Sequence, residues 1–369
     1  MHFGLSEEQT MLQDMLRRCL EERLDLETLK RTAGQPCDPD LWRALVELGV
    51  TGALIPEDHG GSGLGMLEAE VIAESMGRSV APVPYLGTAV LAPLAWQLAG
   101  TPEQRERHLA PIASGAHRYG VGLTEVAGAP RQFGKVTLEG DHAWGRCYFV
   151  IDASDASHFL LTANADTLVV IERGAEGVSI ELLNDVDHTR SLAVVGLERT
   201  PFETVGEPGR AAQAIDALLA AGRLMLAADT FGAAEVMLFR ARDYSMERFQ
   251  FDRPIGSFQG VKHLLADMVT DLEPCRSLIW YAAHVFDAQP AERVLHACHA
   301  KSLASEIGKF IARSSIEIHG GMGFTEELGL HLWYKRIEAN RQLLGGPETV
   351  RHAAAVDQGW VQPLTATAT

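Results

Sequence analysis

A short segment between two long helical stretches carries the residues best suited to bind a ligand, Arg248-Phe-Gln-Phe-Asp-Arg-Pro-Ile-Gly-Ser-Phe-Gln259. Links between long helices are normally short and carry little chemistry, but this one contains two guanidinium groups, those of Arg248 and Arg253. Arginine presents a planar fork of donors that suits phosphate oxygens. The three Phe side chains of the segment could lie against a flat heteroaromatic ring. Composition alone also fits a solvated basic turn, so the meaning of the segment depends on the rest of the chain.

The bulk properties of the chain exclude several classes of protein. Its 369 residues, 46% of them hydrophobic, are enough for two or three domains with a large core. A net charge of −17 makes nucleic acid or an anionic membrane a poor partner. The five Cys are scattered without a Cys-x-x-Cys pair, which indicates reduced thiols. No signal sequence or uncharged membrane-spanning run is evident, so we expect a cytoplasmic protein.

Hydrophobic periodicity divides the chain into three parts that must position the Arg-rich segment. We expect an all-helical domain at 1–116, a small middle β domain at 117–207 and a helical bundle at 208–369. Ser6 with Gln9 predicts a capping box where the first helix begins. The predicted fold class is α+β multidomain, with an antiparallel β-barrel or sandwich between an N-terminal helical domain and a C-terminal four-helix bundle.

The individual elements follow from the same patterns. Further helices of the first part are predicted over 40–48, 66–79, 86–99 and after Thr101-Pro102, where Pro suits the first turn. Strands are predicted at 119–124, 134–138, 143–151, 158–163, 167–172, 177–182 and 192–198. The four bundle helices are predicted at 209–247, 260–288, 290–318 and 326–344. His296-x-x-His299 has metal-ligand spacing on a helix, but no third ligand is evident nearby, so we expect no metal site.

Four motifs in this order resemble the acyl-CoA dehydrogenase family. They are Pro56-Glu-x-x-Gly60-Gly61, Leu123-Thr124-Glu125, Arg248-x-x-Phe251 with Gln259, and Ile318-His-Gly-Gly-Met-Gly-Phe324. The resemblance covers nearly the whole chain. It implies a tetramer that binds FAD and oxidises an acyl-CoA thioester to the 2-enoyl thioester, with an electron-transfer flavoprotein as the expected acceptor. In that chemistry a desolvated carboxylate removes the α proton, and the flavin takes the β hydrogen as hydride.

Both positions that carry the carboxylate base in the family are glycines here. The usual position, after the fourth bundle helix, corresponds to Gly345. The alternative position on the first bundle helix corresponds to Gly222, immediately before Arg223, which matches a family Arg. Glycine has no side chain to accept a proton, so a base would have to come from elsewhere. Glu348, one turn beyond Gly345, is a candidate, although it also fits an exposed acidic residue at a helix start.

The flavin motifs of the middle domain are altered as well. The resemblance places Leu123 and Thr124 at the flavin, but Pro130 replaces the Ser expected near the flavin phosphates. Phe149 stands where a Trp usually packs on the flavin ring, and Ile151 replaces a hydrogen-bonding Thr. Phe149 is thus a candidate ring contact or simply part of the core of the β domain.

The retained motifs are those that a family member offers to the flavin of its neighbour. In the family these are the Arg-x-x-Phe…Gln loop and the Gly-Gly-x-Gly turn, which correspond here to Arg248, Phe251, Gln259, Gly320, Gly321 and Gly323. One departure is Glu317, which stands where a Gln usually meets the pyrophosphate and would repel it unless protonated or paired.

This division suggests a non-catalytic chain that completes the flavin site of a second polypeptide. It resembles the partner subunits of the α2β2 acyl-CoA dehydrogenases that degrade steroid side chains. Two alternatives remain: a self-sufficient homotetramer that uses a displaced base such as Glu348, and a non-enzymatic acyl-CoA-binding or scaffold protein on the same fold.

Overall fold

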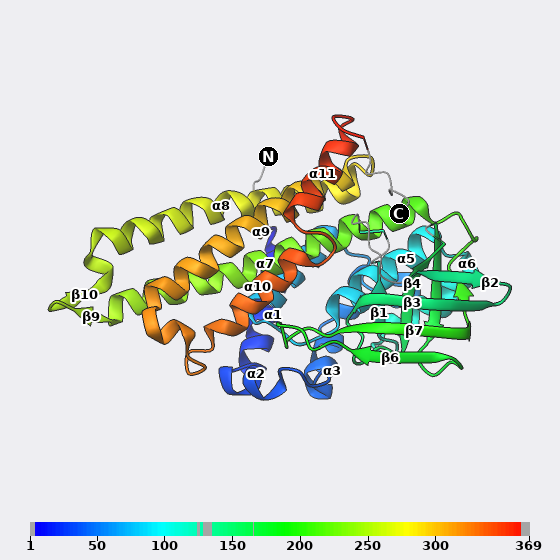
Figure 1. Cartoon of the computed structure of the whole chain (residues 1–369), viewed down its shortest axis with the longest axis horizontal. Helices are drawn as coiled ribbons and strands as arrows, with labels where there is room; N and C mark the ends of the chain where they lie inside the picture. The colour runs from blue at the N-terminus through cyan, green and yellow to red at the C-terminus, as the bar shows by residue number, and fades with distance from the viewer. Residues whose placement is uncertain (1–3, 124–125, 128–134, 165, 363–369) are drawn as a thin grey trace.

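The computed structural model of the chain describes residues 4–123, 126–127, 135–164 and 166–362. The elements follow the predicted order of helices, sheet and helices (Figure 1). The first part contains α1 Glu7–Arg23, α2 Leu26–Thr32, α3 Pro39–Glu47, η1 Val50–Gly52, η2 Glu57–His59, α4 Met66–Arg78, η3 Leu86–Leu91, α5 Ala92–Ala99 and α6 Pro102–Ala113.

Local sequence signals explain most of these helices. The Ser6 hydroxyl accepts from the Gln9 amide at 3.2 Å and the Gln9 side chain accepts from the Ser6 amide at 2.8 Å, which is the predicted capping box. The stretch predicted as one helix over 86–99 is instead a π-helical segment, η3, followed by α5. Pro93 has no amide hydrogen for the α-helical ladder, which accounts for the wider turn before it. Helix α2, which begins at the cap Asp25, was not predicted.

The middle part is an open sheet of eight strands. They are β1 Tyr119–Gly122, β2 Val136–Glu139, β3 His142–Ile151, β4 His158–Ala163, β5 Thr167–Glu172, β6 Val178–Leu182, β7 Leu192–Pro201 and β8 Glu203–Thr204. Their order is β6-β7-β3-β1-β4-β5-β8, with β2 on β3, and no described pairing closes it into a barrel. The expected antiparallel pattern has one exception: β1 is parallel to β4, with Tyr119 opposite His158. Because β1 lies between two strands that run in opposite directions, it must be parallel to one of them.

The C-terminal part contains the four predicted helices and a fifth. They are α7 Ala212–Glu247, α8 Gln259–Ala288, α9 Arg293–His319, α10 Leu330–Gln342 and α11 Pro347–Asp357. The link between α7 and α8 contains a small hairpin, β9 Phe249–Gln250 with β10 Arg253–Pro254, and the turn η4 Ile255–Ser257; η5 Gly320–Phe324 follows α9. Figure 1 shows the hairpin at one end of the bundle and the sheet at the other.

Helix α7 is the central element of the molecule because other elements cover it on all sides. It is the one described helix that is long and apolar enough to cross a membrane, and its apolar window is entirely buried inside the protein. Two glycines bring α4 unusually close to it. A Cβ at Gly77 would lie 1.9 Å from the Asp229 carbonyl oxygen, and one at Gly232 would lie 2.1 Å from the Glu74 carbonyl oxygen. The two helix backbones therefore touch, and neither glycine could be replaced without moving a helix.

Buried aromatic and imidazole rings join the first part of the chain to the sheet. The His108 ring stacks on Trp96 with 3.9 Å between centroids, and its Nε2 lies 3.1 Å from Glu203 Oε2. Tyr119, at the start of β1, has its hydroxyl 3.4 Å from His108 Nδ1. His158 stacks on Tyr119 with 5.1 Å between centroids. Burial, with His117 and His108 close by, lowers the pKa of His158 to about 4.

Acid should weaken this joint. A partly buried His whose pKa is lowered stays neutral in the folded protein, while the unfolded chain takes up the proton near pH 6.5. Its contribution to stability is therefore complete above pH 6.5 and is lost as the pH falls toward 4. We expect His158→Phe to remove about 2 kcal/mol of the decrease in unfolding free energy over that range. Urea unfolding at a series of pH values measures this; replacement of the exposed His263 should change nothing, and equal pH profiles for His158→Phe and wild type would contradict the assignment.

Candidate functional site

Two groups of sequence-predicted site residues lie far apart along α7. Gly222 and Arg223 are in its first third, and Arg248 follows its last residue. At 1.5 Å per residue, Gly222 and Arg248 are about 39 Å apart along the helix axis. Residues near Gly222 and residues near Arg248 therefore cannot contact the same small group within one chain.

The segment after α7 forms a tight hairpin that projects from the end of the bundle (Figure 1). Its two turn residues, Phe251 and Asp252, have φ of 53° and 60°. Two consecutive left-handed residues give the strand reversal of a two-residue hairpin, but a bulky Phe in this region is unfavourable. The Phe251 side chain is nevertheless 86% exposed. A strained and exposed aromatic residue is typical of a binding element rather than of a structural one.

The two arginines of the hairpin have different surroundings. The Arg253 guanidinium lies over the Phe258 ring, 3.9 Å from its centroid. Arg248 is exposed, and its side chain has no hydrogen bond or ion pair with the rest of the described chain. Gln259 is also exposed, as the first residue of α8. Arg248 is thus the guanidinium that remains available for an anionic ligand.

The Gly-Gly turn lies at the same end of the bundle as the hairpin. The His319 ring at the end of α9 stacks on Tyr244 near the end of α7, with 4.5 Å between centroids. In η5, Gly320 has φ of 58°, and a Cβ at Gly323 would lie 2.8 Å from the Ile316 carbonyl oxygen. Gly321 is exposed between them. The structure therefore brings together, at one exposed end, the two motifs that the sequence assigned to a flavin of a neighbouring chain.

The two positions at which the sequence predicts a missing base, Gly222 and Gly345, are linked through Leu344. A Cβ added at Gly222 would be 2.3 Å from Leu344 Cδ1. Gly345 has φ of 105°, and its Cβ would meet Thr349 Cγ2 at 3.2 Å. Arg223 is 4% exposed and donates through Nε to the Leu344 carbonyl oxygen at 3.0 Å. Arg223 therefore fixes the turn that contains Gly345.

Glu348 lies in the first turn of α11. Its side chain is 76% exposed and pairs with Arg351, with Nη2 and Oε1 3.5 Å apart. A base for the α proton of a thioester requires a desolvated carboxylate. The exposure of Glu348 therefore does not support its role as a displaced base.

The remaining predicted contacts lie in the sheet. Leu123 is 2% exposed and belongs to the core, and Phe149 is 41% exposed with φ of 55° at a bulge in β3. Ile151 is buried. Thr124 and Pro130 lie outside the described residues. Among the predicted ring contacts that lie within the described residues, Phe149 has an accessible side chain, whereas Leu123 and Ile151 are buried.

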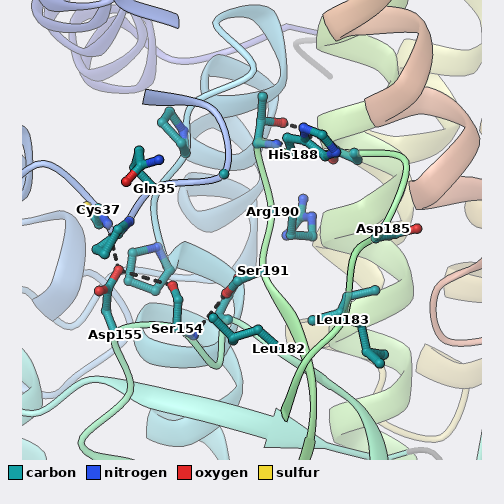
Figure 2. A pocket seen from close by; sticks show the side chains of 18 of the residues that line it. Gln35, Cys37, Ser154, Asp155, Leu182, Leu183, Asp185, His188, Arg190 and Ser191 are labelled. Atoms are coloured by element: carbon teal, nitrogen blue, oxygen red, sulfur yellow. Dashed lines mark hydrogen bonds between the residues drawn. The ribbon is translucent and has the colours of Figure 1, made fainter. Parts of the chain in front are cut away.

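A surface cavity of about 250 Å³ lies elsewhere, between the α2–α3, β3–β4 and β6–β7 loops (Figure 2). None of the site residues predicted from the sequence lines it. Its rim is held by the Cys37 amide, which donates to Asp155 Oδ2 at 2.7 Å. Arg190 stands in the middle of the lining, and its Nη2 lies 3.3 Å from Asp229 Oδ2 on α7. We assign this cavity to the joint between the first part of the chain and the sheet.

Comparisons with known proteins identify the class. The chain matches the acyl-CoA dehydrogenase N-terminal domain over residues 6–116 and the acyl-CoA dehydrogenase C-terminal domain over residues 211–356. It belongs to the acyl-CoA dehydrogenase family, whose members are oxidoreductases.

Individual relatives and solved structures indicate which members of the family this chain resembles. The chain is 32% identical over 314 residues to the acyl-CoA dehydrogenase IpdE2 of Mycobacterium tuberculosis, a match that covers 85% of each chain. Its structure is similar to that of a variant of the Tcur3481-Tcur3483 steroid ACAD, with a TM-score of 0.87, 29% identity and coverage of 96% of this chain and 98% of the other. It is also similar to a chain of the ChsE4-ChsE5 complex from Mycobacterium tuberculosis, with a TM-score of 0.88, 25% identity and coverage of 98% and 100%.

The residues present fit part of an FAD site. The exposed Arg248 and Phe251 suit a phosphate and an aromatic ring, and Gly320 and Gly321 of η5 leave their backbone accessible. At the other end, glycines at both base positions and the buried Ile151 provide neither the carboxylate nor the hydroxyl that the flavin ring and its substrate require. The described residues therefore suit the phosphates of FAD at the hairpin and supply no carboxylate at Gly222 or Gly345.

The backbone at Gly345 can be tested by a conservative change. Gly345→Ala places a side chain at φ of 105°, a conformation that L residues rarely adopt. We expect a loss of about 1–3 kcal/mol in the free energy of unfolding, measured by urea titration. Gly346→Ala is a matched control because φ there is −69°, and should cost no more than about 0.5 kcal/mol. Equal costs at the two positions would contradict a special conformation at Gly345.

Proposed function

We propose that this chain is the non-catalytic subunit of an FAD-dependent acyl-CoA dehydrogenase, and that its hairpin completes a flavin site in a partner chain of the same family. The enzyme would introduce a double bond between the α and β carbons of an acyl-CoA thioester. One observation carries the proposal. The chain keeps an exposed Arg248–Phe251 hairpin at one end of α7, while both base positions at the other end are glycines.

The exposure of the hairpin supports a role between chains. Phe251, Phe249 and Phe324 are 86%, 57% and 78% exposed at the same end of the bundle. Clustered exposed aromatic residues of this kind mark an interaction surface. A ligand held between this end and a neighbouring chain would cover them, with Arg248 near its phosphates. Glu317 is exposed in the last turn of α9, so a positive group of the partner could neutralise it.

FAD, when bound, would supply the hydride acceptor, and the partner chain would supply the base and the contacts to the flavin ring. The names of two similar structures, a steroid ACAD and the ChsE4-ChsE5 complex, support a bulky acyl group such as a steroid side chain and an assembly of two kinds of chain. We further propose an electron-transfer flavoprotein as the electron acceptor and the cytoplasm as the location. A cleft shared by two different chains offers more room for such a group than one cleft alone.

The proposal predicts a flavin that depends on the partner. Purified alone, the chain should be colourless or bind FAD weakly and should not oxidise acyl-CoA. Co-expression with a homologue that carries a Glu base should give about one FAD per pair of chains, measured by absorbance and native mass spectrometry. Strong yellow colour and turnover from the chain alone would refute the proposal.

Within the assembled complex, Arg248→Ala should weaken FAD binding by roughly 10- to 100-fold. This is the effect of losing one hydrogen bond between charged groups, worth about 1.5–3 kcal/mol. The dissociation constant can be measured by flavin fluorescence. Arg242→Ala is the matched control, because Arg242 is also exposed near the end of α7 but pairs with Asp243 at 2.6 Å. Equal effects of the two variants would contradict a phosphate contact by Arg248.

Glu348→Gln separates the proposal from a self-sufficient homotetramer. If Glu348 were the base, this change would abolish activity and leave FAD bound. Since the side chain is exposed and paired with Arg351, we expect the activity of the co-expressed complex to change less than about twofold, in line with the small contribution of exposed ion pairs. A steady-state assay with an artificial electron acceptor measures it.

A further inference from the structure

The two base positions of the family define a point in space. A carboxylate at either position must reach the same α carbon, so the two positions face one another across the place where that carbon lies. In this chain the positions are Gly222 on α7 and Gly345 after α10. The space between them is where an acyl group would sit in the chain's own cleft.

The side chain of Leu344 lies directly against Gly222, where a side chain on α7 would otherwise stand. Leu344 Cδ1 would lie 2.3 Å from a Cβ at Gly222, closer than any real contact, and Leu91 Cδ2 would lie at 3.7 Å. Leu344 is 7% exposed and belongs to the main hydrophobic core. The space left by the missing side chain at Gly222 is therefore filled by the side chain of Leu344.

The position of Leu344 is imposed by its surroundings. Its φ is 55°, a left-handed conformation that a leucine adopts only when the neighbouring structure requires it. Arg223 Nε holds its carbonyl oxygen at 3.0 Å. One turn earlier, Lys301 Nζ donates to the carbonyl oxygen of Asn340. In the described chain neither cation has a carboxylate within 4.0 Å, so both neutralise the carbonyl end of α10 and lock the turn after it.

We propose that Leu344 is a built-in plug that fills the acyl position of this chain's own cleft. The inference rests on the proposed function and extends it: the chain closes its own acyl site while it completes the flavin site of its partner. Arg223 is a positioning residue in this arrangement, because it acts by holding the Leu344 carbonyl. An assembly of two kinds of chain would then hold one acyl group per pair. In this chain, Leu344 would exclude the acyl group, and no base would be present to act on it.

A double-mutant cycle on the full chain tests the contact between Leu344 and Gly222. Gly222→Ala should lower the urea midpoint of the wild-type chain, because its methyl group meets Leu344. In a Leu344→Ala background the same change should cost much less, because that contact is gone. Gly232→Ala is the control: its methyl would meet the Glu74 carbonyl oxygen, which is backbone, so its cost should be the same in both backgrounds. Equal costs of Gly222→Ala in the two backgrounds would overturn the proposal.

Ligand binding provides a second test that holds even if Gly222→Ala fails to fold. The probe is the octyl thioether of CoA, which cannot react, measured by isothermal calorimetry with FAD present. We expect no binding to the wild-type chain and binding of one probe per chain to Leu344→Ala, with Leu343→Ala unchanged from wild type. One probe bound per wild-type chain, or none bound to Leu344→Ala, would overturn the plug. Neither test uses a partner or turnover, so failure here is distinct from failure of the flavin test of the proposed function.

Discussion

The direct backbone contact between α4 and α7 is the constraint on which the rest of the structure depends. Gly77 and Gly232 allow each helix to approach the carbonyl oxygens of the other, at points where any side chain would force them apart. Held this way and covered on all sides, α7 acts as a rigid rod. Its two ends can carry two unrelated tasks because the distance between them is fixed.

Buried charge in this chain is neutralised in two ways. Arg336 and Arg190 are neutralised by carboxylates, with Arg336 Nε 3.4 Å from Asp229 Oδ1 and Arg190 Nη2 3.3 Å from Asp229 Oδ2. Arg223 and Lys301 instead face backbone carbonyls at the end of α10. Burial, with Arg223 nearby, lowers the pKa of Lys301 to about 7. The end of α10 and the turn after it are therefore bound by two basic side chains, Arg223 and Lys301, in a chain whose net charge is −17.

Much of the fold could be predicted because it depends on local patterns. The capping box at Ser6, the short strands between turn residues and the four long bundle helices all follow from spacing and composition. The parallel pairing of β1 with β4 could not be predicted, because it depends on a strand about 40 positions away in the sequence. The π-helical turn before Pro93 and the short helix α2 carry local signals, Pro93 and the cap Asp25, that hydrophobic periodicity does not detect.

The candidate site also combines features that the sequence predicts with features that depend on distant contacts. The sequence alone shows glycines at 222 and 345, the positions at which the family resemblance implies a base. That Leu344 fills the space beside Gly222, and that Arg223 holds its carbonyl, depends on a left-handed residue and a contact across 121 positions of the chain.

The exposed aromatic tip also has a meaning for the cell. A copy of this chain without its partner displays Phe249, Phe251 and Phe324 to solvent on a rigid support, which is the kind of surface that chaperones bind and that aggregates. Surplus copies would then be removed by proteolysis, and the amount of this chain that survives would follow the amount of its partner. The exposed aromatic residues at this end of the bundle would thus help to keep the amounts of the two polypeptides equal.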